Sequence, residues 1–154
     1  MPDVAIVVGH HPAAKGAALT VGERQIQEYD FWDPFAYTLC ARLSIYGIEA
    51  ERIYRPNERP DTELMRRVND TGAELAIELH FNGFTDPRAQ GSEMLYWHAS
   101  DKGRLLADLL QQYTVRTLRV HDRGLKPVHR GRGAASVDSI VTDPPYGLSF
   151  MGKE

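Results

Sequence analysis

The sequence predicts an α/β fold of three layers, in which helices flank a mixed, mostly parallel twisted sheet. Two observations support this class. Short runs of consecutive apolar residues, rich in β-branched side chains, are typical of strands buried on both faces. These runs alternate with longer stretches of helical periodicity, which is typical of parallel strands joined by right-handed crossovers. The 154 residues are 42% hydrophobic, so we expect a single domain over residues 1–154 with a core of its own.

The first third of the chain is expected to hold a buried strand, a loop and a long helix. Five consecutive apolar residues predict the strand over Val4–Val8. Glycines and a proline predict a loop over Gly9–Gly22. The helix is predicted from about Gln25 to Tyr46, and Pro34 marks either its first turn or a kink. Its apolar stripe consists of Phe31, Phe35, Leu39 and Leu43, with Trp32, Ala36 and Cys40 beside it.

The middle of the chain continues the alternation of strand and helix. A strand is expected over Ile48–Tyr54. Asp61 or Thr62 then caps a short helix that ends before Gly72. The apolar run Ala73–His80 predicts the next buried strand.

In the last third, a strand is predicted over Gly91–Trp97. It follows its predecessor without an intervening helix, so we expect it at a sheet edge and antiparallel. Ser100 or Asp101 caps a helix, a polar segment covers His121–Arg132, and a short strand covers Ser139–Thr142. The apolar stripe of that helix is Leu105, Leu106, Leu109, Leu110, Tyr113 and Leu118.

Composition and charge exclude several classes of protein. The net charge of −3 gives no electrostatic attraction to nucleic acid. Residues 116–132 are locally basic, and they form either a solvated face or the wall of a groove for an anionic polymer. The single cysteine, Cys40, excludes an internal disulfide and is expected to be a buried structural thiol. No signal peptide and no membrane-spanning run is found, so we expect synthesis in the cytoplasm, no membrane insertion and a monomer.

Two predicted strands end in a histidine, His10 and His80. The C-terminal ends of parallel strands meet at one edge of a sheet, so these two side chains are expected to share a site. A lone histidine there is more often a hydrogen-bonded structural residue, and a third ligand decides between the two interpretations. Glu28 is the candidate, because helices in parallel sheets begin near that edge, and Glu23 is its rival. A glutamate at a helix start also complements the helix dipole without binding anything.

Two histidines, one carboxylate and an open position form the ligand set of a catalytic zinc site. Imidazole together with carboxylate suits Zn²⁺ better than Mg²⁺ or Ca²⁺, which prefer oxygen ligands. Zinc lowers the pKa of a bound water toward ~7 and polarises a carbonyl, so amide hydrolysis becomes feasible at neutral pH. Zn²⁺ is therefore the expected cofactor.

Several motifs in sequence order carry a resemblance to a known family. They are Val7–His10, Gly16-Ala17, Glu28–Phe31, Leu79–Asn82 and Gly91–Tyr96. With them the chain resembles the zinc-dependent N-acetylmuramoyl-L-alanine amidases over roughly Val4 to Gly133, and its compact form resembles phage endolysins. The resemblance implies that His10, Glu28 and His80 bind zinc. It also implies hydrolysis of the amide between N-acetylmuramoyl and L-alanine in peptidoglycan, with the protein reaching the cell wall after release.

Residues for substrate binding and a general base are also expected. Asn82, beside His80, and Arg130, in the basic segment, are expected to contact the substrate. The family has a late strand that ends in a glutamate acting as the general base. Here Asp143 stands at the end of that strand, one methylene shorter, and Glu78 is the second possibility. Glu154, at the terminus, is expected to be too mobile.

The C-terminal stretch departs from the amidase pattern from about residue 134 to 154. Residues 137–154 resemble phage amino-group DNA methyltransferases through the tetrapeptide Asp143–Tyr146 and its continuation. We interpret this as a junction near Gly133–Ser136 between an amidase gene and a piece of a methyltransferase gene. Chance convergence on a strand and a proline-rich turn is the alternative. Methyl transfer itself is not expected, because no glycine-rich motif for the methyl donor is found.

A second function class stays open at this point. The substitution of the late glutamate is compatible with a remnant that keeps zinc and binds cell walls but no longer cleaves them. Cleavage of purified peptidoglycan separates this remnant from an active amidase.

Overall fold

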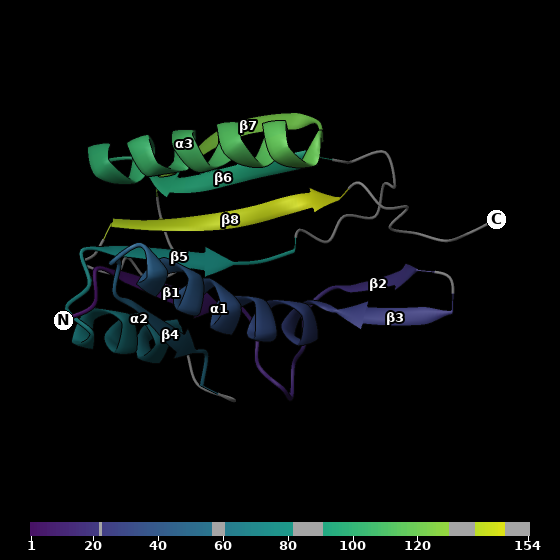
Figure 1. The fold of residues 1–154 in the computed structure, drawn as a ribbon, viewed down its shortest axis with the longest axis horizontal. Coiled ribbons are helices and arrows are strands. Elements are labelled where there is room, and N and C mark those ends of the chain that lie inside the picture. Colours follow the sequence, from purple (N-terminus) through teal and green to yellow (C-terminus); the bar gives the residue numbers. More distant parts are fainter. Residues whose placement is uncertain (22, 57–60, 82–90, 130–137, 147–154) are drawn as a thin grey trace.

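The computed structural model describes residues 1–21, 23–56, 61–81, 91–129 and 138–146. Within them, a six-stranded sheet has the order β4-β1-β5-β8-β6-β7 (Figure 1). Its strands are β1 (Val4–Val8), β4 (Ala50–Tyr54), β5 (Leu75–Leu79), β6 (Gly91–Trp97), β7 (Asp122–Val128) and β8 (Asp138–Tyr146). A separate hairpin consists of β2 (Ala18–Val21) and β3 (Arg24–Gln27), and the helices are α1 (Glu28–Ile45), α2 (Asp61–Asp70) and α3 (Asp101–Leu118).

The sheet confirms the predicted mixed, mostly parallel topology. Strand β1 pairs in parallel with β4 and β5, and β5 pairs in parallel with β8. Strand β6 runs antiparallel to β8 and parallel to β7. The C-terminal ends of β1, β4, β5 and β8 therefore share one edge of the sheet, and the C-terminal ends of β6 and β7 lie at the opposite edge.

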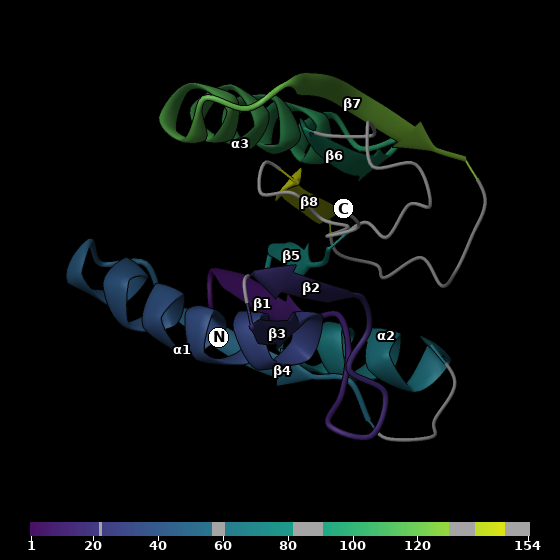
Figure 2. The ribbon, with the colours of Figure 1, turned by 90° about the vertical axis from the view of Figure 1, so that its right-hand side faces the viewer.

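Helices cover both faces, which gives the three predicted layers. Seen along the sheet, α1 and α3 lie on one side and α2 lies on the other (Figure 2). Alternate residues of β1 serve the two faces. Ile6 packs with Trp32 of α1, whereas Val7 packs with Leu64 and Val68 of α2. Every residue of β1 is buried, as its unbroken apolar run predicts.

The contact of α2 with the sheet yields the first testable prediction. Leu64 is fully buried, and Leu64→Ala is expected to lower the free energy of unfolding by about 2–5 kcal/mol, because it removes methyl groups and leaves a cavity. Leu105→Ala is the matched control, since Leu105 in α3 is 63% exposed and its loss should cost less than about 0.5 kcal/mol. Urea unfolding measures both. Equal costs would contradict this placement of α2.

The hairpin corrects the prediction of a loop over residues 9–22 and of a helix from residue 25. β-Branched Thr20, Val21 and Ile26 favour extended backbone, and Leu19 lies opposite Ile26 in the ladder. Helix α1 therefore begins at Glu28. Gln27 makes no side-chain cap.

The apolar stripes predicted for two helices were partly wrong. In α1, Phe31 and Phe35 are 42% and 43% exposed, and Trp32 and Ala36 are the buried apolar residues. Pro34 lies inside the helix, not in its first turn. In α3, the exposed apolar residues are Leu105, Leu109, Tyr113 and Leu118. Helix α3 packs on the sheet through Gly103, Ala107 and Gln111, with Leu106 and Leu110 partly buried.

The buried side-chain amide of Gln111 explains why this side of α3 faces the sheet. The Nε2 atom of Gln111 donates hydrogen bonds to the Ser92 carbonyl oxygen and to Asp122 Oδ1, both at 2.6 Å. Small residues let the helix approach the strands closely enough for these bonds. A pattern of leucines alone does not reveal such a contact.

The position of β6 in the strand order also differs from the prediction. Strand β6 is antiparallel to β8, as predicted, but it is not an edge strand, because β7 forms within the polar segment His121–Arg132, for which no strand was predicted. Pro127 lacks an N–H group and is therefore compatible with an edge strand. Strand β8 extends beyond Ser139–Thr142 at both ends, and its register with β6 shifts between Gly91 and Glu93.

Cys40 lies in α1 and packs in the core between this helix and the sheet. Burial raises the pKa of its thiol. Among the described residues, no helix combines the length and the apolar character needed to cross a membrane.

Candidate metal centre

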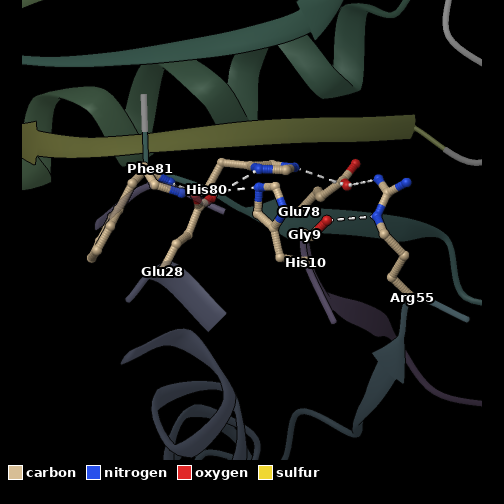
Figure 3. A network of polar contacts seen from close by, with 8 residues as sticks. Gly9, His10, Glu28, Arg55, Glu78, His80 and Phe81 are labelled. Carbon is tan, nitrogen blue, oxygen red and sulfur yellow. Dashed lines mark hydrogen bonds and ion pairs between the residues drawn. The ribbon is translucent and has the colours of Figure 1, made fainter. Parts of the chain in front are cut away.

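Three side chains from distant parts of the sequence converge where β1 and β5 end (Figure 3). His10 follows β1 by two residues, His80 directly follows β5, and Glu28 is the first residue of α1. Potential ligand atoms of the three lie within 4.8 Å of one another. The Nε2 atom of His10 lies 3.2 Å from Glu28 Oε2, and the Nδ1 atom of His80 lies 3.1 Å from Glu28 Oε1.

The backbone explains why these residues meet. Strands β1 and β5 are neighbours, and the Gly9 N–H donates to the Leu79 carbonyl oxygen at 3.1 Å beyond their ladder. The start of α1 is attached to the loop after β1, because the Glu28 and Tyr29 N–H groups donate to the carbonyl oxygens of Ala17 and Lys15. These bonds replace a side-chain cap and bring Glu28 to the edge where the strands end.

Glu28 is a buried carboxylate, 1% exposed, with both oxygens engaged. Its Oε2 accepts from the Ala17 N–H at 2.9 Å, and its Oε1 accepts from the Phe81 N–H at 2.7 Å. Burial opposes ionisation. The hydrogen bonds from His10, His80 and the two N–H groups outweigh it and lower the pKa of Glu28 to about 2. The site therefore contains a fixed negative charge between two imidazoles.

His80 lies between two carboxylates. Its Nδ1 faces Glu28, and its Nε2 lies 3.0 Å from Glu78 Oε1. Burial lowers the pKa of His80, but hydrogen bonds to Glu28 and Glu78, together with their charges, raise it to about 9. A carboxylate only accepts hydrogen bonds, so both ring nitrogens carry protons in the metal-free protein.

Glu78 and Arg55 extend this network away from Glu28. Arg55 Nη2 donates to Glu78 Oε1 at 2.9 Å, and Arg55 Nε donates to the carbonyl oxygen of Gly9 (Figure 3). Burial raises the pKa of Glu78. The hydrogen bond from His80 and the charges of His80 and Arg55 outweigh burial and lower it.

Two glycines let the backbone approach the site closely. A Cβ atom at Gly9 would overlap the His80 ring. At Gly16, where φ is +77°, it would overlap Glu28 Oε2 and lie 2.5 Å from Cδ2 of His10. This close enclosure, with two imidazoles and one carboxylate as donors, fits a zinc ion bound by His10, Glu28 and His80.

Gly9 provides a second testable prediction. Gly9→Ala should displace the His80 ring and weaken zinc binding by at least about tenfold. The control is Gly47→Ala, where no atom lies within 4 Å of the new Cβ. There the positive φ should cost about 1–2 kcal/mol of stability without affecting zinc. Competition with a zinc chelator measures both affinities. Wild-type affinity in Gly9→Ala would contradict the close packing.

The other predicted site residues are placed less completely. Glu23, the rival of Glu28, is exposed in the hairpin connection and is not part of the cluster. Asn82 and Arg130 lie outside the described residues, as does the side chain of Asp143. The backbone of Asp143 pairs with Glu93 in the β8–β6 ladder.

Arg55 is a site residue that sequence reasoning missed. It directly follows β4, which ends at the same sheet edge as β1 and β5. A cation directly after a strand, at the edge where two histidines also follow strands, is the signal that could have identified it. In the basic segment, Arg123 is paired with Glu93 at 3.0 Å.

Comparisons with known proteins agree with this architecture. The catalytic domain of the CD27L endolysin, which targets Clostridium difficile, is 24% identical with a TM-score of 0.73, covering 92% of this chain and 80% of that one. AmiC2 of Nostoc punctiforme is 18% identical with a TM-score of 0.72, covering 93% and 79%. An N-acetylmuramoyl-L-alanine amidase from Clostridium difficile 630 is 19% identical with a TM-score of 0.71, covering 92% and 78%.

At these identities the solved structures establish a shared fold, and no curated protein matches significantly. A family model gives the family itself. The model Amidase_3, described as N-acetylmuramoyl-L-alanine amidase, matches residues 4–139 and ends within β8. Since that match includes both histidine-bearing strand ends, the start of α1 and most of the sheet, the chain belongs to the N-acetylmuramoyl-L-alanine amidase family.

Proposed function

We propose that this protein hydrolyses the amide between N-acetylmuramoyl and L-alanine in peptidoglycan and that it depends on Zn²⁺ bound by His10, Glu28 and His80. The convergence of these three side chains within 4.8 Å carries the proposal. The family match supports the reaction, and the donor set supports the metal. When bound, zinc supplies an acidified water and a Lewis acid for the scissile carbonyl.

The residues of the chain then have separate tasks. Glu28 keeps its negative charge through two backbone N–H groups and holds the two imidazoles on either side of it. His80 must give up its Nδ1 proton to bind a metal, while its Nε2–H stays directed at Glu78. Asn82 and Arg130 are proposed to contact the peptide or the sugar.

Asp143 is our candidate for the general base, with Glu78 as the alternative. Support comes from the register of β8. Thr142 pairs with Leu79 of β5, so Asp143 and His80 each come one residue beyond that pair. Glu78 is already bonded to both His80 and Arg55, which makes it the less available base.

A third prediction separates the two carboxylates. Asp143→Asn should lower kcat by about 10²–10⁴-fold without changing zinc content, because it removes general-base catalysis alone. Asp138→Asn, at the other end of the same strand, is the control and should leave kcat unchanged. Steady-state hydrolysis of a soluble muropeptide, with metal analysis of each sample, gives both values. An unchanged kcat in Asp143→Asn would exclude it as the base.

Product analysis tests the function itself. Zinc-loaded protein is incubated with purified peptidoglycan, and the soluble products are examined by mass spectrometry. We expect stem peptides with free L-alanine amino termini and no new reducing sugars. Intact peptidoglycan that retains the zinc-loaded protein is the result expected of a binding remnant and would contradict hydrolysis.

We further propose that the physiological role is lysis of the cell wall, as for an endolysin. The likeness in fold to the catalytic domain of an endolysin supports this role. The family match ends at residue 139, within the stretch 137–154. For that stretch we propose an origin in a methyltransferase gene, with the junction near Gly133–Ser136.

A further inference from the structure

One arginine connects the two strand ends that carry the histidines. Arg55 follows β4, which pairs with β1, and β1 pairs on its other side with β5. To reach Glu78 on β5, the Arg55 side chain must cross the end of β1. On the way its Nε donates to the carbonyl oxygen of Gly9, the residue before His10 (Figure 3).

Glu78 completes the connection to the centre. Its Oε1 accepts from Arg55 Nη2 at 2.9 Å and lies 3.0 Å from His80 Nε2. The Arg55 and Glu78 side chains are 21% and 15% exposed. A buried carboxylate is costly unless it is paired, so the guanidinium makes an ionised Glu78 tolerable beside the site.

This arrangement determines which ring nitrogen of His80 is available. An ionised carboxylate paired with Arg55 can only accept, so Nε2 of His80 keeps its hydrogen. The ring nitrogen left to bind a metal is then Nδ1, which lies on the side of Glu28 and His10, 3.1 Å from Glu28 Oε1. Partners of this kind fix the tautomer and the ring orientation of metal-binding histidines.

We propose that Arg55 and Glu78 are positioning residues, which hold His80 with Nδ1 toward Glu28 and His10 and thereby set the affinity of the centre for Zn²⁺. The inference rests on the proposed zinc-dependent function. It gives Glu78 a role other than that of the general base, and it links the His10 and His80 strand ends through one side chain.

The test compares zinc affinity, measured by competition with a chelator, in wild type, Glu78→Gln and Arg55→Lys. In Glu78→Gln the neutral amide still accepts from Nε2–H but lacks the charge, so zinc binding should weaken by about 10- to 100-fold. Arg55→Lys keeps the charge but loses the fork that reaches Gly9 and Glu78 together, and should show a loss in the same direction. Glu74→Gln is the matched control, since Glu74 precedes β5 and is exposed, and it should bind zinc as wild type does.

A spectroscopic readout distinguishes positioning from general damage. In zinc-loaded wild type, ¹⁵N NMR of the His80 ring should show a protonated Nε2 and a metal-bound Nδ1. In Glu78→Gln the Nε2 proton should exchange faster with water. Thermal unfolding of each metal-free variant checks folding. If Glu78→Gln is poorly folded, Glu78→Asp serves in its place, because it keeps the charge and should recover part of the affinity.

The outcomes separate this inference from the proposed function. If wild type binds no zinc, the proposed function fails. If wild type binds zinc and both Glu78→Gln and Arg55→Lys bind it equally well, the positioning role is overturned. A lower kcat in Glu78→Gln with unchanged zinc affinity and an unchanged His80 spectrum would instead identify Glu78 as the base.

Discussion

His80→Ala is expected to abolish both zinc binding and peptidoglycan hydrolysis. The variant removes one of three ligands and leaves Glu28 with one imidazole partner. Bound zinc should fall from about one per chain to a trace, and hydrolysis should fall by at least about 10³-fold, since the Lewis acid contributes several kcal/mol to the transition state. Elemental analysis of the purified variant and release of L-alanine amino termini measure the two losses.

His98→Ala is the matched control for this variant. His98 directly follows β6 as His80 follows β5, but β6 ends at the opposite edge of the sheet, and His98 is exposed. Its loss should leave zinc and activity unchanged. Full zinc occupancy in His80→Ala would contradict the proposed ligand set.

Zinc affinity is expected to rise about tenfold per pH unit between about pH 7 and pH 9. Glu28 and Glu78 raise the pKa of His80 to about 9 in the metal-free protein, despite the opposing effect of burial. One proton must therefore leave when zinc binds below that pH. Glu28, with a pKa of about 2, stays ionised throughout and adds nothing to the slope.

Chelator-buffered zinc titrations at several pH values give this slope, and calorimetry in buffers of different ionisation enthalpy counts the proton. The same proton makes the metal-free fold depend on pH. Because the folded-state pKa of His80 lies above its ordinary value of 6.5, the stabilisation is complete below about pH 6.5 and is lost as the pH rises toward 9. A zinc affinity that is equal at pH 7 and pH 9 would contradict the placement of His80 between two carboxylates.

The central strands of the sheet were predictable because each is a run of consecutive apolar residues, which is typical of a strand buried on both faces. Val4–Val8 is buried on both faces, so every position must be apolar. The convergence of His10, Glu28 and His80 also followed from local signals, since the edge where parallel strands end is known once the strands are known.

The parts that were missed depend on contacts between distant residues. Strand β7 exists because it pairs with β6, and its polar sequence alone does not reveal that pairing. The orientation of α3 depends on hydrogen bonds from Gln111 to Ser92 and Asp122. Arg55 belongs to the site because its guanidinium crosses β1 to reach Glu78, 23 positions along the chain.

The most direct test of the zinc-dependent amidase is a titration of metal-free protein with zinc while L-alanine amino termini released from purified peptidoglycan are counted. We predict no release without metal, and a release rate that rises with added zinc and saturates at about one zinc per chain. Release at the same rate in the metal-free protein, or no release at saturating zinc, would contradict the proposed function.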